Sequence, residues 1–319
     1  MIEVKNLTKR YGNHLAVDHL NFTVESGKIY GFLGPNGAGK STTMNIMTGY
    51  LGATEGQELI DGHDILKEPE EAKKNIGYLP EIPPLYMEMT VREYLEFAAE
   101  LKGIKKDKRE PQIEEVIRLA KLRAVENRLI QNLSKGYKQR VGLAQAVLGF
   151  PEIIILDEPT VGLDPKQIIE IRELIRKLAK KHTVILSSHI LAEVREVCDY
   201  IMIISGGKLV ASDTTENLEN MMSGKGQIEV EAKASRDEMD HIIRRTGKIK
   251  EVKYRTSASG ITTAQIIAKG GEDIREELFL AFSHADVPML TLNQSKTTLE
   301  EIFLELTQGS GNRMIKEEK

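Results

Sequence analysis

Hydrophobic and polar positions follow one pattern in the first two thirds of the chain. Up to about residue 222, short apolar runs alternate with amphipathic helical segments, which is typical of an α/β domain built on a buried sheet. The runs IIIL (153–156) and TVILS (183–187) are too apolar to alternate, as expected of parallel strands covered on both faces. Between them lies an apolar stripe at helical spacing: Ile168, Ile171, Ile175 and Leu178.

Two further segments complete this part. The stretch from about 85 to 149 is helical almost throughout, and Thr90 with Glu93 predicts a capping box at the start of one helix. The segment YIMIISGGKLVAS (200–212) predicts a hairpin that turns at its two glycines. The pattern therefore predicts one domain over 1–222, with a helical subdomain inserted at about 85–149.

A different pattern begins after SGKG (223–226), which we interpret as a linker. Residues 227–308 alternate strand-like and helical segments in the order βαββαβα, and Ser235 with Glu238 predicts a capping box at the start of the first helix. This order predicts a small C-terminal α+β domain of the ferredoxin-like type. The polar tail 309–319 is expected to be disordered.

Composition narrows the class of protein. The 319 residues carry a net charge of −4, which gives no basic footprint for nucleic-acid binding. The one cysteine fits a reducing compartment, and no apolar stretch approaches the roughly 18 residues of a membrane span. The N-terminal MIEVKNLTKRYG is polar and does not resemble a signal peptide. We therefore expect a cytoplasmic protein whose membrane role would require a partner.

The segment GPNGAGKST carries the first candidate chemistry. Its residues Gly34, Gly39, Lys40 and Ser41 complete the pattern G-x-x-x-x-G-K-[ST] between a predicted strand and a predicted helix. In that context the backbone N–H groups converge on a β-phosphate, the lysine reaches the β- and γ-phosphates, and the serine hydroxyl ligates Mg²⁺. The alternative is a chance glycine turn.

Two acids end the strand at IIILDE. Asp157 is expected to hold Mg²⁺ opposite Ser41, which leaves Glu158 to orient and deprotonate a water in line with the γ-phosphate. The alternative is a strand end with solvated acids.

Two other motifs suggest phosphate contacts. His189, in SSHILAE just past a strand, could reach a γ-phosphate, although a solvated or capping histidine is the alternative. The other six histidines are expected at the surface. Ser134 and Gly136, in LSKGYKQR, begin a helix whose N-terminus could bind an anion or could simply be capped.

The order GPNGAGKST, LSKGYKQR, ILDEPTVGLDP and SSH resembles the nucleotide-binding subunit of an ATP-binding cassette (ABC) transporter, over residues 1–222. The resemblance implies a P-loop NTPase fold of the ABC type and hydrolysis of ATP with Mg²⁺. It also implies that LSKGYKQR is the signature motif, whose Ser134 and Gly136 contact ATP held by a second cassette. Two chains, expected to be identical, would then enclose two ATP molecules head to tail.

The resemblance also assigns single residues. Tyr11 is similar to the aromatic residue that stacks on adenine, and Asp164 belongs to a segment similar to the D-loop at the dimer seam. Glu158, His189 and Lys40 are implied to be catalytic. The implied phosphate-loop contacts are Gly34, Pro35, Asn36, Gly37, Ala38, Gly39, Lys40, Ser41 and Thr42.

Two positions depart from the family pattern. Glu81 stands where the family usually has a glutamine that contacts the metal and faces the membrane partner. It could still ligate Mg²⁺, but it adds negative charge and cannot donate a hydrogen bond. Lys135 and Tyr137 replace the commoner glycine and glutamine of the signature, while Ser134 and Gly136 remain.

Three functions are compatible with these motifs. The resemblance favours an ATPase subunit that powers a separate integral-membrane permease, docked near residues 81–97 at the inner face of the cell membrane. The C-terminal segment TLEEIFLELT and the variant signature resemble the bacterial drug, antibiotic and gliding-motility exporters, which implies export. The second function is a soluble ABC ATPase that acts on nucleic acid or the ribosome; the single phosphate loop and acidic charge disfavour it, and no nucleic acid is expected as a partner. In the third, the C-terminal domain regulates the cassette by sensing a ligand or stabilising a dimer.

Overall fold

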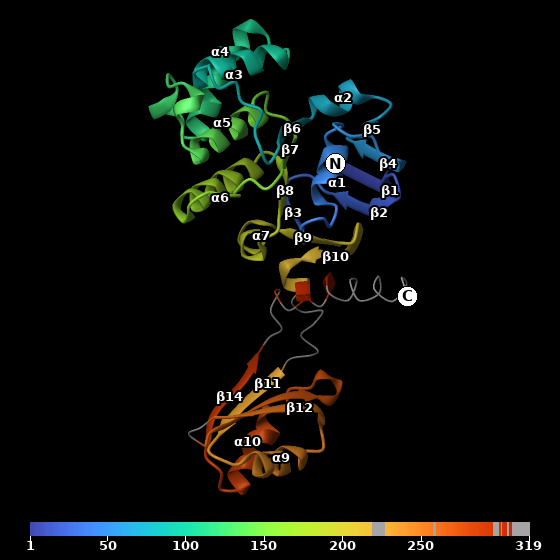
Figure 1. The fold of residues 1–319 in the computed structure, drawn as a ribbon, viewed down its shortest axis with the longest axis vertical. Helices are drawn as coiled ribbons and strands as arrows, with labels where there is room; N and C mark the ends of the chain where they lie inside the picture. Colours follow the sequence, from blue (N-terminus) through green and yellow to red (C-terminus); the bar gives the residue numbers. More distant parts are fainter. Residues whose placement is uncertain (219–226, 258–259, 296–299, 301, 305, 308–319) are drawn as a thin grey trace. The chain divides into compact units, whose positions relative to one another are not determined.

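The chain folds into two compact units, the first containing Met1–Thr214 and the second Thr215–Glu305 (Figure 1). The computed structural model describes all residues except 219–226, 258–259, 296–299, 301, 305 and 308–319. The expected linker at 223–226 and the expected tail at 309–319 thus lie outside the described residues. The domain boundaries at 222 and 227 remain predictions.

A six-stranded sheet forms the centre of the first unit, in the order β10-β9-β3-β8-β7-β6. All neighbouring strands are parallel except the pair β9 and β10. The carboxyl ends of β3, β8, β7 and β6 therefore meet at one edge, where parallel α/β sheets bind ligands. Its strands are β3 (Ile29–Leu33), β6 (Ile76–Leu79), β7 (Ile153–Leu156), β8 (Thr183–Ser188), β9 (Tyr200–Ser205) and β10 (Lys208–Thr214).

The predictions for this sheet are confirmed. Every residue of β7 and β8 is buried, as the lack of polar alternation in their sequences indicated, and β9 and β10 form the expected hairpin. The apolar stripe between β7 and β8 lies on α6 (Pro165–Ala179), which buries Ile171, Ile175 and Leu178. The helices α2 (Pro69–Lys74) and α7 (Leu191–Val197) also lie beside this sheet.

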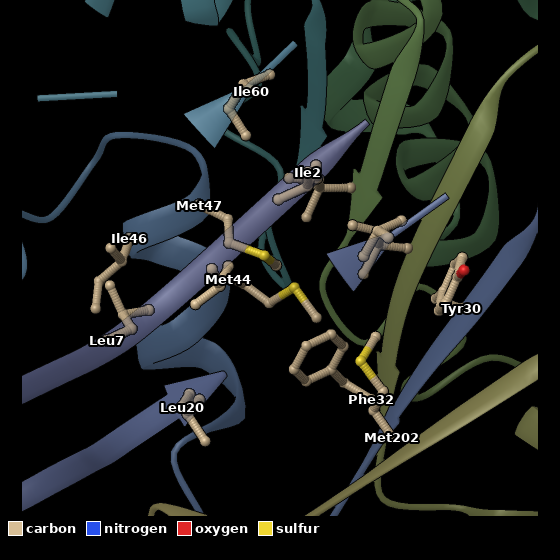
Figure 2. Packing of buried hydrophobic residues seen from close by; sticks show 14 of the residues in the cluster. Ile2, Leu7, Leu20, Tyr30, Phe32, Met44, Ile46, Met47, Ile60 and Met202 are labelled. Carbon is tan, nitrogen blue, oxygen red and sulfur yellow. The ribbon is translucent and has the colours of Figure 1, made fainter. Parts of the chain in front are cut away.

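A second, antiparallel sheet shares its core with the first. Its order is β2-β1-β4-β5, and α1 (Lys40–Met47) contributes to the same cluster of buried side chains. Figure 2 shows Met44 and Met47 of α1 packed with Ile2 of β1 and Phe32 of β3. Burying each such side chain contributes about 1.5–3 kcal/mol, so this cluster holds the start of α1 against the sheet edge. The strands are β1 (Ile2–Tyr11), β2 (His14–Val24), β4 (Glu55–Ile60) and β5 (His63–Asp64).

A helical subdomain occupies the segment expected at 85–149. The side chain of Thr90 accepts the N–H of Glu93 and the carboxylate of Glu93 accepts the N–H of Thr90, which confirms the capping box. A Cβ on Gly77 of β6 would lie 2.1 Å from the carbonyl oxygen of Ala146, so the subdomain packs against the sheet through a glycine. Its elements are α3 (Val91–Leu101), α4 (Lys106–Leu119), the 3₁₀ turns η1 (Arg123–Val125) and η2 (Ile130–Asn132), and α5 (Lys135–Val147).

The second unit contains an antiparallel sheet in the order β12-β13-β11-β14. This order, with two helices between the strands, is that of a ferredoxin-like βαββαβ unit. Ser235 caps α9 by accepting the N–H of Glu238, but the described residues show no return bond to the Glu238 carboxylate, so only half of the predicted capping box forms. Val230, Ile266 and Phe282 are among its buried residues. The elements are β11 (Gln227–Ala232), α9 (Arg236–Arg244), β12 (Ile249–Thr256), β13 (Thr262–Ala268), the turn η3 (Lys269–Gly271), α10 (Arg275–His284) and β14 (Met289–Ser295).

Across the described part of the chain, no helix combines the length and apolar character that crossing a bilayer requires.

Candidate functional site

The glycine-rich loop joins β3 to α1 at the carboxyl edge of the central sheet. Gly39, directly before α1, has a φ of 103°, which side-chain-bearing residues rarely adopt. A Cβ there would also lie 2.5 Å from the carbonyl oxygen of Ala16. The positive φ and the close approach of the Ala16 carbonyl therefore both require glycine at this position.

Lys40 is the first residue of α1 and is 6% exposed. Its Nζ donates to the carbonyl oxygens of Gly34, at 2.7 Å, and Pro35, at 3.3 Å. It also lies 3.9 Å from Glu158 Oε1. Burial lowers the pKa of this ammonium group, while the carboxylates of Glu158 and Asp157 act in the opposite direction. A buried cation held by the loop's own carbonyls is suited to receive a phosphate oxygen.

Oxygen ligands for a hard cation converge at the same edge. Ser41 Oγ lies 3.4 Å from Asp157 Oδ1, and Asp157 is 4% exposed. The hydroxyl of Ser187, on the neighbouring strand β8, donates to the same carboxylate oxygen. A hydroxyl and a carboxylate at this spacing fit Mg²⁺, which prefers oxygen ligands and uses few from the protein.

Glu158 and His189 follow two neighbouring strands, β7 and β8, and meet at the sheet edge. His189 Nδ1 lies 2.9 Å from Glu158 Oε2, and Glu158 is 7% exposed. The backbone N–H of Glu158 donates to Ser187 Oγ at 2.9 Å. Because Asp157 and Glu158 are both buried, the alternative of a strand end with solvated acids is wrong.

One pocket of about 570 Å³ collects most of the predicted residues. Tyr11 is 49% exposed at this pocket, so it is not a packed strand-end tyrosine. Gly34, Pro35, Ala38 and Asp157 belong to the same loops but are not part of its lining. The predicted residues that do line it are Tyr11, Asn36, Gly37, Gly39, Lys40, Ser41, Thr42, Glu81, Glu158 and His189.

The segment LSKGYKQR lies elsewhere. Of the described residues that line the pocket, none comes from 133–140, and Asp164 is not among them either. Ser134 caps α5, where its hydroxyl accepts the N–H of Tyr137 at 3.4 Å. A Cβ on Gly136 would lie 2.5 Å from the Gln167 side chain, so α5 begins against α6, which Asp164 caps.

Sequence reasoning missed or misplaced several residues. His182 was expected at the surface but is 6% exposed, because Nδ1 hydrogen-bonds the carbonyl oxygen of Pro151 at 2.6 Å. His14 lines the pocket, and its position three residues after Tyr11 in the same strand connection could have indicated this. Ser187 was not predicted to contact Asp157, although it lies two residues before His189 in the sequence.

Comparison with known proteins agrees with the motifs. The ABC transporter domain family matches residues 17–161. The bacitracin transport ATP-binding protein BcrA of Bacillus licheniformis is 43% identical over 221 residues, which cover 69% of this chain and 71% of that protein. The linearmycin resistance ATP-binding protein LnrL of Bacillus subtilis (strain 168) is 31% identical over 308 residues, which cover 96% of this chain and 98% of that protein.

Solved structures give the same result for the fold. An ATP-binding subunit of an ABC transporter has a TM-score of 0.64 and 32% identity. That match covers 70% of this chain and 93% of the subunit. A dimeric ATP-binding cassette in a post-hydrolysis state with ADP and Pi has a TM-score of 0.61 and 28% identity. That match covers 67% of this chain and 98% of the cassette. The predicted cassette fold and the family resemblance are confirmed: the chain belongs to the ABC transporter family, as an ATP-binding subunit that hydrolyses ATP.

Proposed function

We propose that two copies of this chain enclose two ATP molecules head to tail, and that this closure drives a separate membrane permease. The observation that carries the proposal is the separation of the two phosphate-binding motifs. The pocket around Lys40 is open at its mouth, whereas Ser134 and Gly136 lie outside its lining. The N-terminus of α5 presents backbone N–H groups and a positive dipole end, which suits the γ-phosphate of an ATP held by the partner.

The residues of one pocket have separate roles in binding and hydrolysing ATP. Tyr11 stacks on adenine, and Lys40 with the loop N–H groups binds the β- and γ-phosphates. Glu158 takes a proton from the attacking water. The oxygen of that water bonds to the γ-phosphorus as the bond between the γ-phosphorus and the ADP oxygen breaks. His189 contacts the γ-phosphate and is oriented by Glu158, 2.9 Å away.

Ser41 and Asp157 hold Mg²⁺ in this proposal, with Glu81 as a third oxygen ligand from the pocket wall. The cation would neutralise charge on the β- and γ-phosphates. The 3.4 Å separation of Ser41 Oγ and Asp157 Oδ1 supports the first two ligands, and the place of Glu81 in the pocket lining supports the third.

The permease is expected to dock near residues 81–97, after β6 and at the start of the helical subdomain. Ile82 is 82% exposed there, and Tyr86 is 51% exposed. Apolar side chains this exposed are suited to a protein interface. Since BcrA and LnrL are named for bacitracin transport and linearmycin resistance, we propose export, with the chain bound at the inner face of the cell membrane.

The sandwich is tested with Glu158→Gln. This variant should bind ATP but hydrolyse it about 10²–10⁴-fold more slowly, so that dimers accumulate in size-exclusion chromatography with light scattering. Lys40→Ala is the matched control and should stay monomeric with ATP. Wild-type turnover in Glu158→Gln would show that the assignment of the base is wrong.

The transport role is tested by recovery of partners. Tagged protein purified from detergent-solubilised native membranes should bring down one polytopic membrane protein in stoichiometric amount, identified by mass spectrometry. Ile82→Glu should lose this partner and retain ATPase activity. Recovery of ribosomes or nucleic acid instead would favour the soluble ATPase.

A further inference from the structure

Another buried carboxylate lies close to Glu158 and His189, and the proposed reaction does not use it. Glu193, on α7, is 6% exposed. Its Oε2 accepts a hydrogen bond from Thr160 Oγ1 at 2.5 Å and another from Ser188 Oγ at 3.2 Å. Thr160 follows Glu158 by two residues, and Ser188 directly precedes His189. One carboxylate oxygen therefore joins the two loops that carry the candidate base and the candidate γ-phosphate contact.

The backbone of Glu158 requires such support. Its φ is 47°, in the left-handed region that residues with side chains rarely occupy. A conformation of this kind persists only where neighbouring contacts hold it. On one side, the N–H of Glu158 donates to Ser187 Oγ at 2.9 Å. On the other side, the bond between Thr160 and Glu193 fixes the turn two residues further along.

The loop of His189 is held from the same point. Ser188 Oγ donates to Glu193 and also accepts the N–H of Ile190 at 3.0 Å, so the residues on both sides of His189 are fixed. Ser188 is 1% exposed and Thr160 is 6% exposed. In such a buried site, hydrogen bonds to a carboxylate are stronger than bonds between neutral groups, and a lost donor is not replaced by water.

We propose that Glu193 is a positioning residue for ATP hydrolysis. It sets the separation of Glu158 and His189 by holding Thr160 and Ser188, and it touches neither the nucleotide nor the attacking water. The inference depends on the roles proposed above for Glu158 and His189. It adds a residue outside the pocket lining on which the rate of hydrolysis depends.

The test compares two substitutions at one position. Thr160→Val keeps the size of the side chain and removes the hydroxyl, whereas Thr160→Ser keeps the hydroxyl. We expect Thr160→Val to lower kcat at least tenfold with the Kd for ATP unchanged within twofold. Thr160→Ser should keep kcat within about twofold of wild type. A purely structural role would lower Tm and the fraction of folded protein, and would leave the kcat of the folded protein unchanged.

A double-mutant cycle tests whether Thr160 acts through Glu193. If Thr160 and Glu193 act through one contact, Thr160→Val combined with Glu193→Gln should lose no more kcat than the worse single variant. Additive losses, or normal turnover in Thr160→Val beside a slow Glu158→Gln, would overturn this inference alone. Wild-type turnover in Glu158→Gln would overturn the proposed function, and this inference with it.

Discussion

His189 Nδ1 lies 2.9 Å from Glu158 Oε2, so the ends of β7 and β8 meet through a histidine and a carboxylate. Lys40 Nζ lies 3.9 Å from the other oxygen of the same carboxylate. Glu158 thus stands between the phosphate-loop lysine and the histidine. A water placed against the γ-phosphate by these groups would have its proton acceptor already in position.

This arrangement predicts the effect of removing the imidazole. His189→Ala should lower kcat by about 10²-fold or more, because Glu158 loses its orienting contact and the γ-phosphate loses a ligand. The Kd for ATP, measured by fluorescence titration, should change much less. His63→Ala alters a partly exposed histidine that pairs with Glu68, outside the pocket lining, and should keep full turnover. A His189→Ala enzyme with wild-type kcat would contradict the assignment.

The proposed stacking on Tyr11 should contribute to nucleotide affinity whichever base the nucleotide carries. Tyr11→Ala should weaken ATP binding about 5- to 150-fold, since stacking of a base on an aromatic ring contributes about 1–3 kcal/mol. GTP should be affected by a similar factor because every base offers a flat face. Tyr11→Phe retains the ring and should keep most of the affinity. Equal affinities for the alanine and phenylalanine variants in isothermal titration calorimetry would refute stacking.

Glu58 predicts how stability depends on pH. It is 2% exposed on β4, and neither carboxylate oxygen has a hydrogen-bond partner among the described residues. Burial, together with the nearby charge of Asp64, raises the pKa of Glu58 from 4.5 to about 8. The folded state therefore holds this proton up to about pH 8, while the unfolded chain releases it near pH 4.5. Stability from this group is lost as pH rises through that window, by about 3 kcal/mol at pH 7.

The test replaces Glu58 by an apolar residue of similar length. Glu58→Met should raise Tm, and the gain should be larger at pH 8 than at pH 5.5 in differential scanning calorimetry. At about 2–4 °C per kcal/mol, the gain at pH 7 should be several degrees. Glu55→Met, at an exposed position of the same strand, is the control and should show little pH dependence. A pH-independent gain in Glu58→Met would exclude the buried carboxyl as its cause.

The close packing of α5 on Gly77 predicts that a side chain at this position lowers the stability of the protein. A Cβ there would lie 2.1 Å from the Ala146 carbonyl oxygen, so Gly77→Ala must push α5 away from β6. We expect a loss of about 1–3 kcal/mol in urea unfolding, as for other overpacked positions. Gly52→Ala is the control, because its nearest neighbour would be at 3.8 Å. Equal stabilities of the two variants would contradict this packing.

The sequence predicted those parts of the site that depend on local pattern. The loop before Lys40, the acids after β7 and the histidine after β8 were all placed by their strand contexts. Parallel pairing then brings the ends of these strands to one edge, so proximity follows from topology. Ser134 could be recognised as a helix cap, but only the family resemblance implied a partner's phosphate.

The remaining contacts depend on register and packing, which no local pattern encodes. Thr160 and Glu193 are 33 positions apart, and nothing in either segment indicates that their side chains meet. Glu58 lies in EGQELI, where a polar residue at an inward position looks like solvent-facing surface. Its burial follows from the pairing of β4 with β1, which places Glu58 opposite the buried Val4.

The most direct test of the central claim mixes two inactive variants. Lys40→Ala cannot bind phosphate in its own loop, and Ser134→Arg blocks the signature of its own chain. Each alone should show almost no ATPase activity. In a mixed dimer the intact loop of one chain faces the intact signature of the other, so an equal mixture should recover about a quarter of the wild-type rate. No recovery, or full activity of Ser134→Arg alone, would contradict the head-to-tail sandwich.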